Sequence, residues 1–198
     1  TAALTATVDA RGTGNSGFAG EINETAGNGV ISSFDRINSV LGGTLSDTLD
    51  LLPLNGATPI DGSLTLNSAG STYTELLTSQ ALEFGSFESI NTGGGNDTVS
   101  VETDFSAVLN TGSGTGQLTL LAGVTLTGTF TSGAGVDSLL LNTGASITGN
   151  VELGDGDDSV QLDSSATIDG TLNGDDGSDT LSFTNYTTPR TVTLEQAS

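Results

Sequence analysis

Short runs in which apolar and polar residues alternate recur along most of the chain, separated by clusters of glycine, asparagine and aspartate. "VTLTGTF" at 124–130 and "SITGNV" at 146–151 are two such runs. A period of two residues is typical of β-strands with one buried face, and long amphipathic helical patterns are missing. The pattern therefore predicts an all-β chain built from many short strands.

These runs belong to a repeated unit. "GDGDDSVQL" at 154–162 resembles "GAGVDSLLL" at 133–141 and "GDDGSDTLSF" at 174–183. The aspartates of these copies are equally spaced, since 158 − 137 = 21 and 179 − 158 = 21. A fixed period of this size indicates a repeat architecture. The aspartates that occupy this place in the recognisable copies are Asp47, Asp97, Asp137, Asp158 and Asp179, and Gly116 takes the place in one further copy.

A second set of positions has the same period. Leu126, Ile147 and Ile168 follow one another at intervals of 21 residues (147 − 126 and 168 − 147), and Phe105 precedes Leu126 by the same interval. Two independent stripes with one period predict coils that stack in register. A corner glycine repeats with them at Gly128, Gly149 and Gly170.

The expected fold is a parallel β-solenoid, similar to a right-handed β-helix or β-roll, with coils of about 20–25 residues. Within one coil, residues 144–153 are expected to form one alternating strand and residues 159–163 a second, with a glycine turn between them. Equal positions in successive coils should stack about 4.8 Å apart. The predicted inward ladders are Leu126–Ile147–Ile168, Phe130–Val151–Leu172 and Val99–Leu118–Leu139–Val160–Leu181.

The repeat is less regular in the first half of the chain. We expect residues 1–92 to form irregular solenoid coils with loop insertions, and residues 93–198 to form the regular stack of the same continuous domain. Residues 73–85 are only weakly periodic and predict either a strand or a short helical turn. The chain is expected to be a segment of a longer protein.

Composition narrows the chemistry. The 198 residues include 24 acidic and only three basic side chains, no histidine and no cysteine, for a formal net charge of −21. Such a chain should repel nucleic acid and anionic membrane surfaces and attract multivalent cations. The missing cysteine and histidine remove disulfides, the usual zinc ligands and the usual general base. The chain contains no run of about 18 consecutive apolar residues, so membrane insertion is not expected.

The glycine–aspartate motif resembles the calcium-binding nonapeptide of RTX proteins, G-G-x-G-x-D-x-U-x. "LGDGDDSVQ" matches it at Gly154, Gly156, Asp158 and Val160. In that family, carboxylates and turn carbonyls of stacked turns share calcium, so the resemblance implies Ca²⁺ between the coils. The metal ligands expected on this basis are Asp97, Asp137, Asp155, Asp157, Asp158, Asp175, Asp176 and Asp179.

The resemblance covers roughly residues 90–185 and departs from the family in its period. RTX rolls carry two nonapeptides in each coil of about 18 residues, whereas this chain carries one in about 21. Its other half, "SITGN", looks more like the passenger segments of autotransporter-type surface proteins, whose β-helices need no metal. The alternative to calcium is that each aspartate caps a turn by hydrogen bonding to its own backbone.

The favoured function is a structural or adhesive segment of a secreted or cell-surface bacterial protein, such as a stalk or lattice subunit. Expected partners are like subunits or other surface proteins joined end to end, or glycans. An enzyme is not expected, because no base, nucleophile or cofactor motif is evident and no pair of carboxylates is singled out. The alternatives are a non-catalytic carbohydrate-binding module, or an ice- or crystal-surface binder that uses the outward threonines around Thr125 and Thr148.

Overall fold

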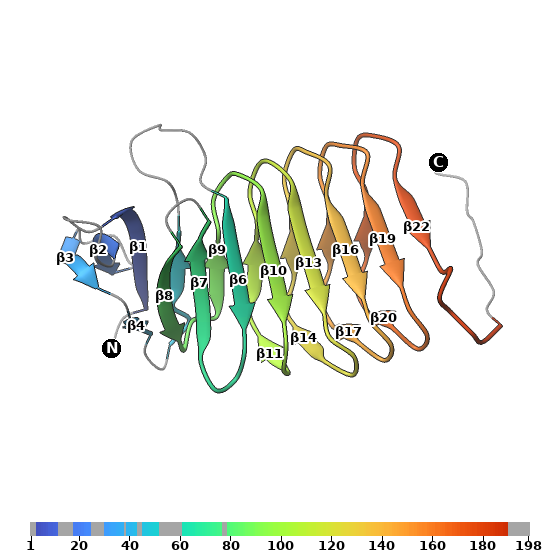
Figure 1. Cartoon of the computed structure of the whole chain (residues 1–198), viewed down its shortest axis with the longest axis horizontal. Coiled ribbons are helices and arrows are strands. Elements are labelled where there is room, and N and C mark those ends of the chain that lie inside the picture. Colours follow the sequence, from blue (N-terminus) through green and yellow to red (C-terminus); the bar gives the residue numbers. More distant parts are fainter. Residues whose placement is uncertain are drawn as a thin grey trace.

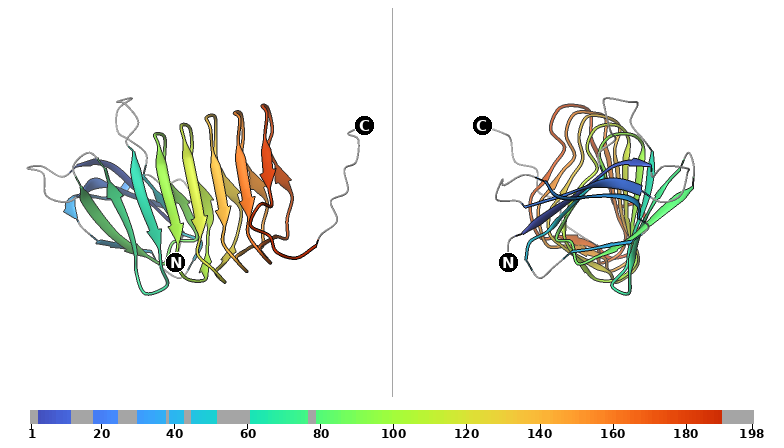
Figure 2. Two further views of the ribbon diagram at one scale, coloured as in Figure 1. Left: turned by 45° about the vertical axis from the view of Figure 1, so that its right-hand side comes forward. Right: turned by 90° about the vertical axis from the view of Figure 1, so that its left-hand side faces the viewer.

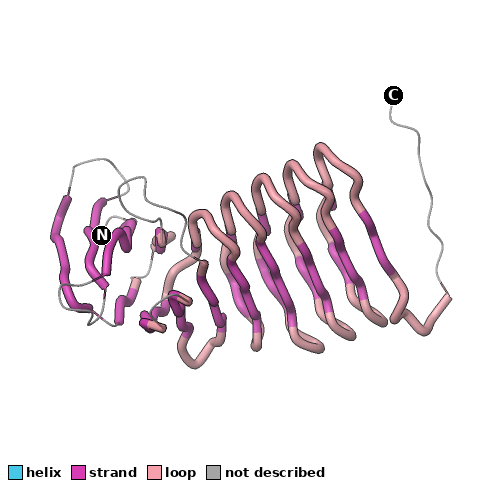
Figure 3. The backbone as a smooth tube through the Cα atoms, turned by 45° about the horizontal axis from the view of Figure 1, so that its top comes forward, coloured by secondary structure: helices cyan, strands magenta, loops and turns pink. Residues whose placement is uncertain are grey.

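The computed structural model describes residues 3–11, 18–24, 30–37, 39–42, 45–51, 61–76 and 79–189. These residues contain strands, turns and loops and no helix (Figure 3). The strands run across a long axis along which about four regular coils are stacked (Figure 1). Seen along that axis, successive coils nearly superimpose (Figure 2). The expected all-β parallel solenoid is confirmed.

Three sheets form the walls of the stack, and the first, sheet A, has nine strands. Its strands pair in parallel except at the N-terminal side, where β1, β2 and β3 pair antiparallel. In spatial order, sheet A contains β3 (Val30–Ile37), β2 (Phe18–Glu24), β1 (Leu4–Arg11), β5 (Thr48–Asp50), β9 (Ser89–Asn91), β12 (Val108–Asn110), β15 (Phe130–Thr131), β18 (Val151–Glu152) and β21 (Leu172–Asn173).

Sheet B also has nine strands, and most of its length is parallel. An antiparallel hairpin, β7–β8, is inserted in the coil that starts at β6. In spatial order, sheet B contains β4 (Ser39–Leu41), β8 (Gln80–Gly85), β7 (Ser71–Glu75), β6 (Gly62–Leu66), β10 (Asp97–Val101), β13 (Gly116–Leu120), β16 (Ser138–Leu141), β19 (Ser159–Leu162) and β22 (Thr180–Ser182). Residues 73–75 and 80–85 are therefore strand, the first of the two alternatives that the sequence of this segment allows.

Sheet C closes the third side with four short parallel strands. It contains β11 (Phe105–Ser106), β14 (Thr125–Thr127), β17 (Ser146–Ile147) and β20 (Thr167–Ile168). Each regular coil thus passes from sheet B to sheet C and then to sheet A.

The three predicted ladders are confirmed by the strand register. Leu126 pairs with Ile147, and Ile147 with Ile168. In sheet A, Phe130 pairs with Val151, and Val151 with Leu172, and the first two are fully buried. Sheet B carries the ladder Val99–Leu118–Leu139–Val160–Leu181. Each buried aliphatic side chain contributes roughly 1.5–3 kcal/mol, so the ladders form the continuous core of the stack.

One strand expectation is wrong. Residues 144–153 do not form one strand, because the chain turns a corner after Ile147 and leaves sheet C for sheet A. Gly149 lies at this corner, directly over the preceding coil. A Cβ atom on Gly149 would lie 2.3 Å from the carbonyl oxygen of Gly128, so only glycine fits. The alternation of apolar residues continues through the corner and hides it in the sequence.

Candidate functional site: a buried aspartate column

Each regular coil turns from sheet A to sheet B through the glycine-rich segment of the repeat. The corners of neighbouring coils lie very close, and the Gly135 N–H donates to the Asp155 carbonyl oxygen (2.8 Å). A Cβ atom on Gly156 would lie 1.6 Å from the Gly135 carbonyl oxygen. The glycine also has a φ of 150°, which L-residues rarely adopt. The glycines of the motif thus allow the corners to stack by backbone contact alone.

The aspartate that follows the corner points into the stack. Asp97 and Asp137 are 1% exposed and Asp158 is 2% exposed. In the coil of Asp137, the alternation of side chains places this aspartate on the same face as Leu139 and Leu141, which are buried. In these three coils the motif buries a carboxylate in the wall of the core, whereas Asp179 in the last described coil is exposed.

Each carboxylate bonds to the backbone of the preceding coil. The Gly116 N–H donates to Asp137 Oδ1 (2.5 Å), and the Asp137 N–H donates to Asp158 Oδ1 (2.7 Å). The Asp158 N–H in turn donates to Asp179 Oδ1 (3.0 Å). The bonds run between coils, not within one turn as in an Asx-turn. The aspartates form a column that ties each corner to the next.

Asp97 has a second hydrogen bond in addition to the backbone bond. Its Oδ1 accepts from the Gly62 N–H (2.8 Å), and its Oδ2 accepts from the Thr92 hydroxyl (2.7 Å). Thr92 lies five residues before the aspartate, at the end of the sheet A strand. Both oxygens of this buried carboxylate are therefore satisfied, as buried polar atoms in proteins usually are.

Asp137 and Asp158 lack this second bond. Asp137 has Ser132 five residues before it, but the Ser132 hydroxyl donates to the Leu153 carbonyl oxygen (2.6 Å). Asp158 has the apolar Leu153 in that place. The Oδ2 atoms of Asp137 and Asp158 are buried and have no hydrogen-bond partner among the described residues.

The coil without an aspartate shows the complementary defect. Thr111 occupies the place of Thr92, but Gly116 stands where Asp97 stands in its own coil. The buried Thr111 Oγ1 consequently has no hydrogen-bond partner in the described part of the chain. The hydroxyl and the carboxylate therefore bond to each other in the coil of Asp97, and they do not in the coils that follow.

Burial raises the pKa of Asp97 to about 6, although the bonds from Thr92 and Gly62 act in the opposite direction. Burial also raises the pKa of Asp137 and of Asp158. The charges of the neighbouring carboxylates add to this effect, from Asp158 on Asp137 and from Asp179 on Asp158. Desolvation and like charges both favour the neutral acid in the folded protein.

The expected metal ligands are divided between the two sides of the corner. Asp155, Asp157 and Asp176 are exposed, on the outer side, whereas Asp158 of the same corner is buried. Asp157 Oδ1 accepts from the Ser178 N–H (2.9 Å). Asp175 is exposed and accepts from the Asn173 side-chain amide (2.6 Å).

The inner and outer carboxylates therefore do not converge. Within the described ranges, no group of three or more acidic side chains is arranged to hold a metal ion. The inner aspartates each commit one oxygen to a backbone N–H. Calcium binding by this set stays a prediction, because the geometry supplies no preformed cage of six to eight oxygens.

Asp47 belongs to another part of the structure. It precedes β5 of sheet A, and its Oδ1 accepts from the Leu4 N–H (2.7 Å). Its copy of the motif therefore does not extend the column.

The hydroxyl residues Thr92, Thr111 and Ser132 were not predicted as site residues. A hydroxyl five residues before the aspartate position is nevertheless visible in three successive copies of the motif.

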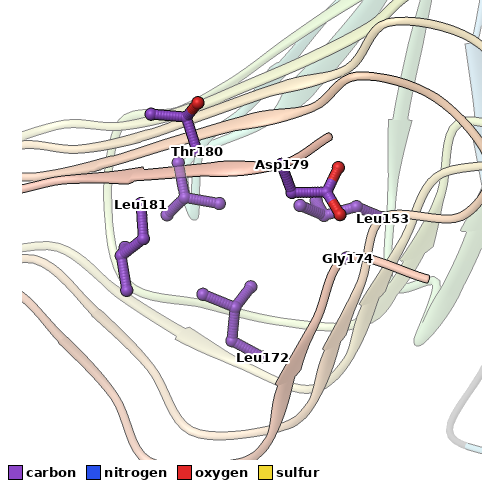
Figure 4. A pocket seen from close by; sticks show the side chains of 7 residues that line it. Leu153, Leu172, Gly174, Asp179, Thr180 and Leu181 are labelled. Carbon is purple, nitrogen blue, oxygen red and sulfur yellow. The ribbon is translucent and has the colours of Figure 1, made fainter. Parts of the chain in front are cut away.

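A cavity of about 200 Å³ lies at the C-terminal side of the described stack (Figure 4). Leu172, Leu181 and Leu153 line it, and the Asp179 carboxyl group lies beside Gly174. Gly174 occupies the place that Leu153 fills one coil earlier, which removes a side chain from the interior. The cavity is the interior of the last described coil, and Asp179 is the only acidic residue among the described residues that line it.

Comparisons with protein-family models, with curated proteins and with solved structures find no match. The class of protein is accordingly defined by the fold, a parallel β-solenoid with coils of about 21 residues. Among the described residues, no helix is long and apolar enough to cross a membrane.

Proposed function

We propose that this chain is a structural or adhesive segment of a secreted or cell-surface bacterial protein, of the kind found in RTX-like proteins or autotransporter passengers. The observation that carries the proposal is the continuous stack of coils (Figure 1). Sheets A and B extend through the regular coils, and most of their strands are only two to five residues long. Such a stack presents its outward side chains at a fixed spacing from coil to coil, which suits a spacer or an adhesive surface.

The arrangement of titratable groups supports a non-catalytic role. The three most buried aspartates of the column use one oxygen each to hold the backbone of the neighbouring coil. The cavity in the last described coil is lined mainly by aliphatic side chains. Catalysis by carboxylates needs an acid and a base that face one substrate, and these groups serve packing instead.

Localisation tests the proposal directly. Antibodies against the chain should label intact cells of the source organism or detect the protein in the culture medium. Protease treatment of intact cells should remove the cell-associated signal. A signal confined to the cytoplasmic fraction would refute the proposal.

Calcium is a separate part of the proposal. If the ion stabilises the corners, millimolar calcium should raise the melting temperature relative to excess chelator. A site occupied at [L] = 100 Kd contributes about 2.7 kcal/mol, which a melt resolves. An unchanged melting temperature would contradict calcium binding, and the aspartate column would then serve only to hold neighbouring coils together.

A further inference from the structure

Sheet B has a broad outer face that carries no charged side chain along its six parallel strands. Its parallel strands β6, β10, β13, β16, β19 and β22 lie side by side along the stack (Figure 1). Two columns of side chains point outward from them. The first column contains Ser63, Thr98, Gln117, Ser138, Ser159 and Thr180, in strand register. The second contains two threonines, two serines, one glutamine and one leucine.

None of these positions is charged, although the chain has 24 acidic residues. The outer face of sheet A, in contrast, carries Asp50 and Glu152. The outward columns of sheet C are also uncharged and are flanked by Asp104 and Asp169, but its four strands are only two or three residues long. Glu83 is exposed on β8, in the antiparallel part of sheet B, whereas acids beside the parallel strands lie at the rims, such as Asp157 at one corner and Asp163 at the other.

We propose that the outer face of sheet B binds a neutral polysaccharide. The inference rests on the adhesive role proposed above and names its surface and its partner. Hydroxyl and amide groups both donate and accept hydrogen bonds, so the face matches a polyhydroxylated chain. Acidic rims on both sides disfavour acidic polysaccharides, nucleic acid and anionic membranes.

The size of the face argues against a second protein. Six strands about 4.8 Å apart and about 16 Å long present roughly 400 Å². A stable protein–protein interface takes about 800 Å² from each partner. A second copy would also bring its own acidic rims against these. A polysaccharide, by contrast, can bind many copies of this protein along its length, and the many contacts together strengthen the attachment.

Ice is a less suitable partner for the same face. Gln117 extends further from the sheet than the neighbouring Thr98 and Ser138, so the surface is not a flat array of hydroxyls. Flexible amides can adapt to sugar hydroxyls.

A pull-down with insoluble polysaccharides tests the inference on the full chain. We expect retention on at least one neutral polymer among cellulose, chitin and β-1,3-glucan, and none on acidic polygalacturonate or alginate gels. Because no ion pairs are involved, about 1 M salt, where the Debye length is about 3 Å, should leave retention unchanged.

Matched charge variants locate the surface. Gln117→Glu combined with Ser159→Glu adds two charges to the face and should lower the bound fraction about tenfold, because a carboxylate loses hydration on contact. Thr127→Glu combined with Thr148→Glu adds the same charge to the exposed side of sheet C and should have no effect. The isosteric Gln117→Glu alone keeps the fold and should weaken binding by a smaller factor.

Several results would overturn the inference. In the pull-down, these are failure to bind any of the neutral polymers, an equal loss of binding in both double variants, or a loss of binding at high salt. Two results would point to another partner. They are thermal hysteresis of a freezing solution of the protein, and a concentration-dependent dimer that the sheet B variants abolish. None of them affects the localisation test. A surface-located protein that ignores neutral glycans would refute only this inference, and a cytoplasmic protein would refute the proposed function itself.

Discussion

The coils that begin at Asp97 and at Asp158 bury the same carboxylate at the same corner but satisfy it differently. Asp97 accepts one hydrogen bond from the backbone of the preceding coil and one from the Thr92 hydroxyl. Asp158 accepts only the backbone bond, because Leu153 replaces the hydroxyl. The bond between coils is therefore the constant element, and the hydroxyl is an addition that only some coils have.

This difference explains how a repeat protein can keep an acid in its core. A carboxylate is tolerated where the neighbouring coil offers a strand-end N–H that has no strand partner of its own. The remaining oxygen decides how much of the desolvation cost is left. The predictions below alter one part of this arrangement at a time.

The largest effect is expected when a carboxylate is placed in the core away from the corner. Ile147→Asp buries an acid where both strand neighbours are apolar, so it should cost about 4 kcal/mol or more in the free energy of unfolding, measured by urea denaturation. Thr148→Asp, one residue further and exposed, should change it by less than about 0.5 kcal/mol. Equal losses would mean that the strand register is wrong.

Gly156→Ala should break the contact between corners. The added Cβ atom would lie 1.6 Å from the Gly135 carbonyl oxygen, so the coils must separate. Gly70→Ala is a matched control, because Gly70 has the same φ of 150° and no atom within 4 Å of an added Cβ. We expect Gly156→Ala to lower the free energy of unfolding by at least about 2 kcal/mol more than the control. Similar losses would show that only the backbone angle matters.

Thr92→Val removes the hydroxyl that distinguishes the Asp97 coil. It leaves Asp97 Oδ2 buried without a donor and should cost about 1–3 kcal/mol at neutral pH. Thr111→Val makes the same change where the hydroxyl already has no partner, and should be neutral or stabilising. Denaturation curves of the two variants, compared with the wild type, test this. If Thr111→Val were the more damaging, the pairing of hydroxyl and carboxylate would have no energetic weight.

The smallest effect concerns pH. Burial raises the pKa of Asp97 from its usual 3.8 to about 6 in the folded protein, so the folded state holds more protons than the unfolded state between these pH values. The stabilisation from protonated Asp97 is full below about pH 4 and is lost as pH rises through about 6, and the raised pKa values of Asp137 and Asp158 act in the same direction. Asp158→Asn should raise stability at pH 7 and flatten this slope, because burial also raises the pKa of Asp158. Denaturation of the wild type and of Asp158→Asn across pH 4–8 measures both effects.

A slope of the opposite sign, equally present in the wild type and in Asp158→Asn, would mean that the column remains charged throughout. A slope that disappears on adding calcium would instead indicate that a cation neutralises the same carboxylates.

The sequence by itself determined the architecture of the regular coils. The interval of 21 residues, shared by the aspartates and by the Leu126–Ile147–Ile168 stripe, specifies stacking in register. These are periodic and local properties, since a buried apolar residue and a corner glycine recur wherever the chain repeats its course. The three inward ladders follow from them without knowledge of any contact.

The tertiary structure alone decided what the aspartates do. Whether Asp158 faces solvent or the core depends on how the backbone leaves the glycine corner, and its hydrogen-bond partner, the Asp137 N–H, belongs to another coil. The break after Ile147 is hidden for the same reason, because alternation continues through a corner held by the stacked Gly128 and Gly149. A repeat fixes which residues stack, but the path of the backbone at the corners fixes which side chains are buried.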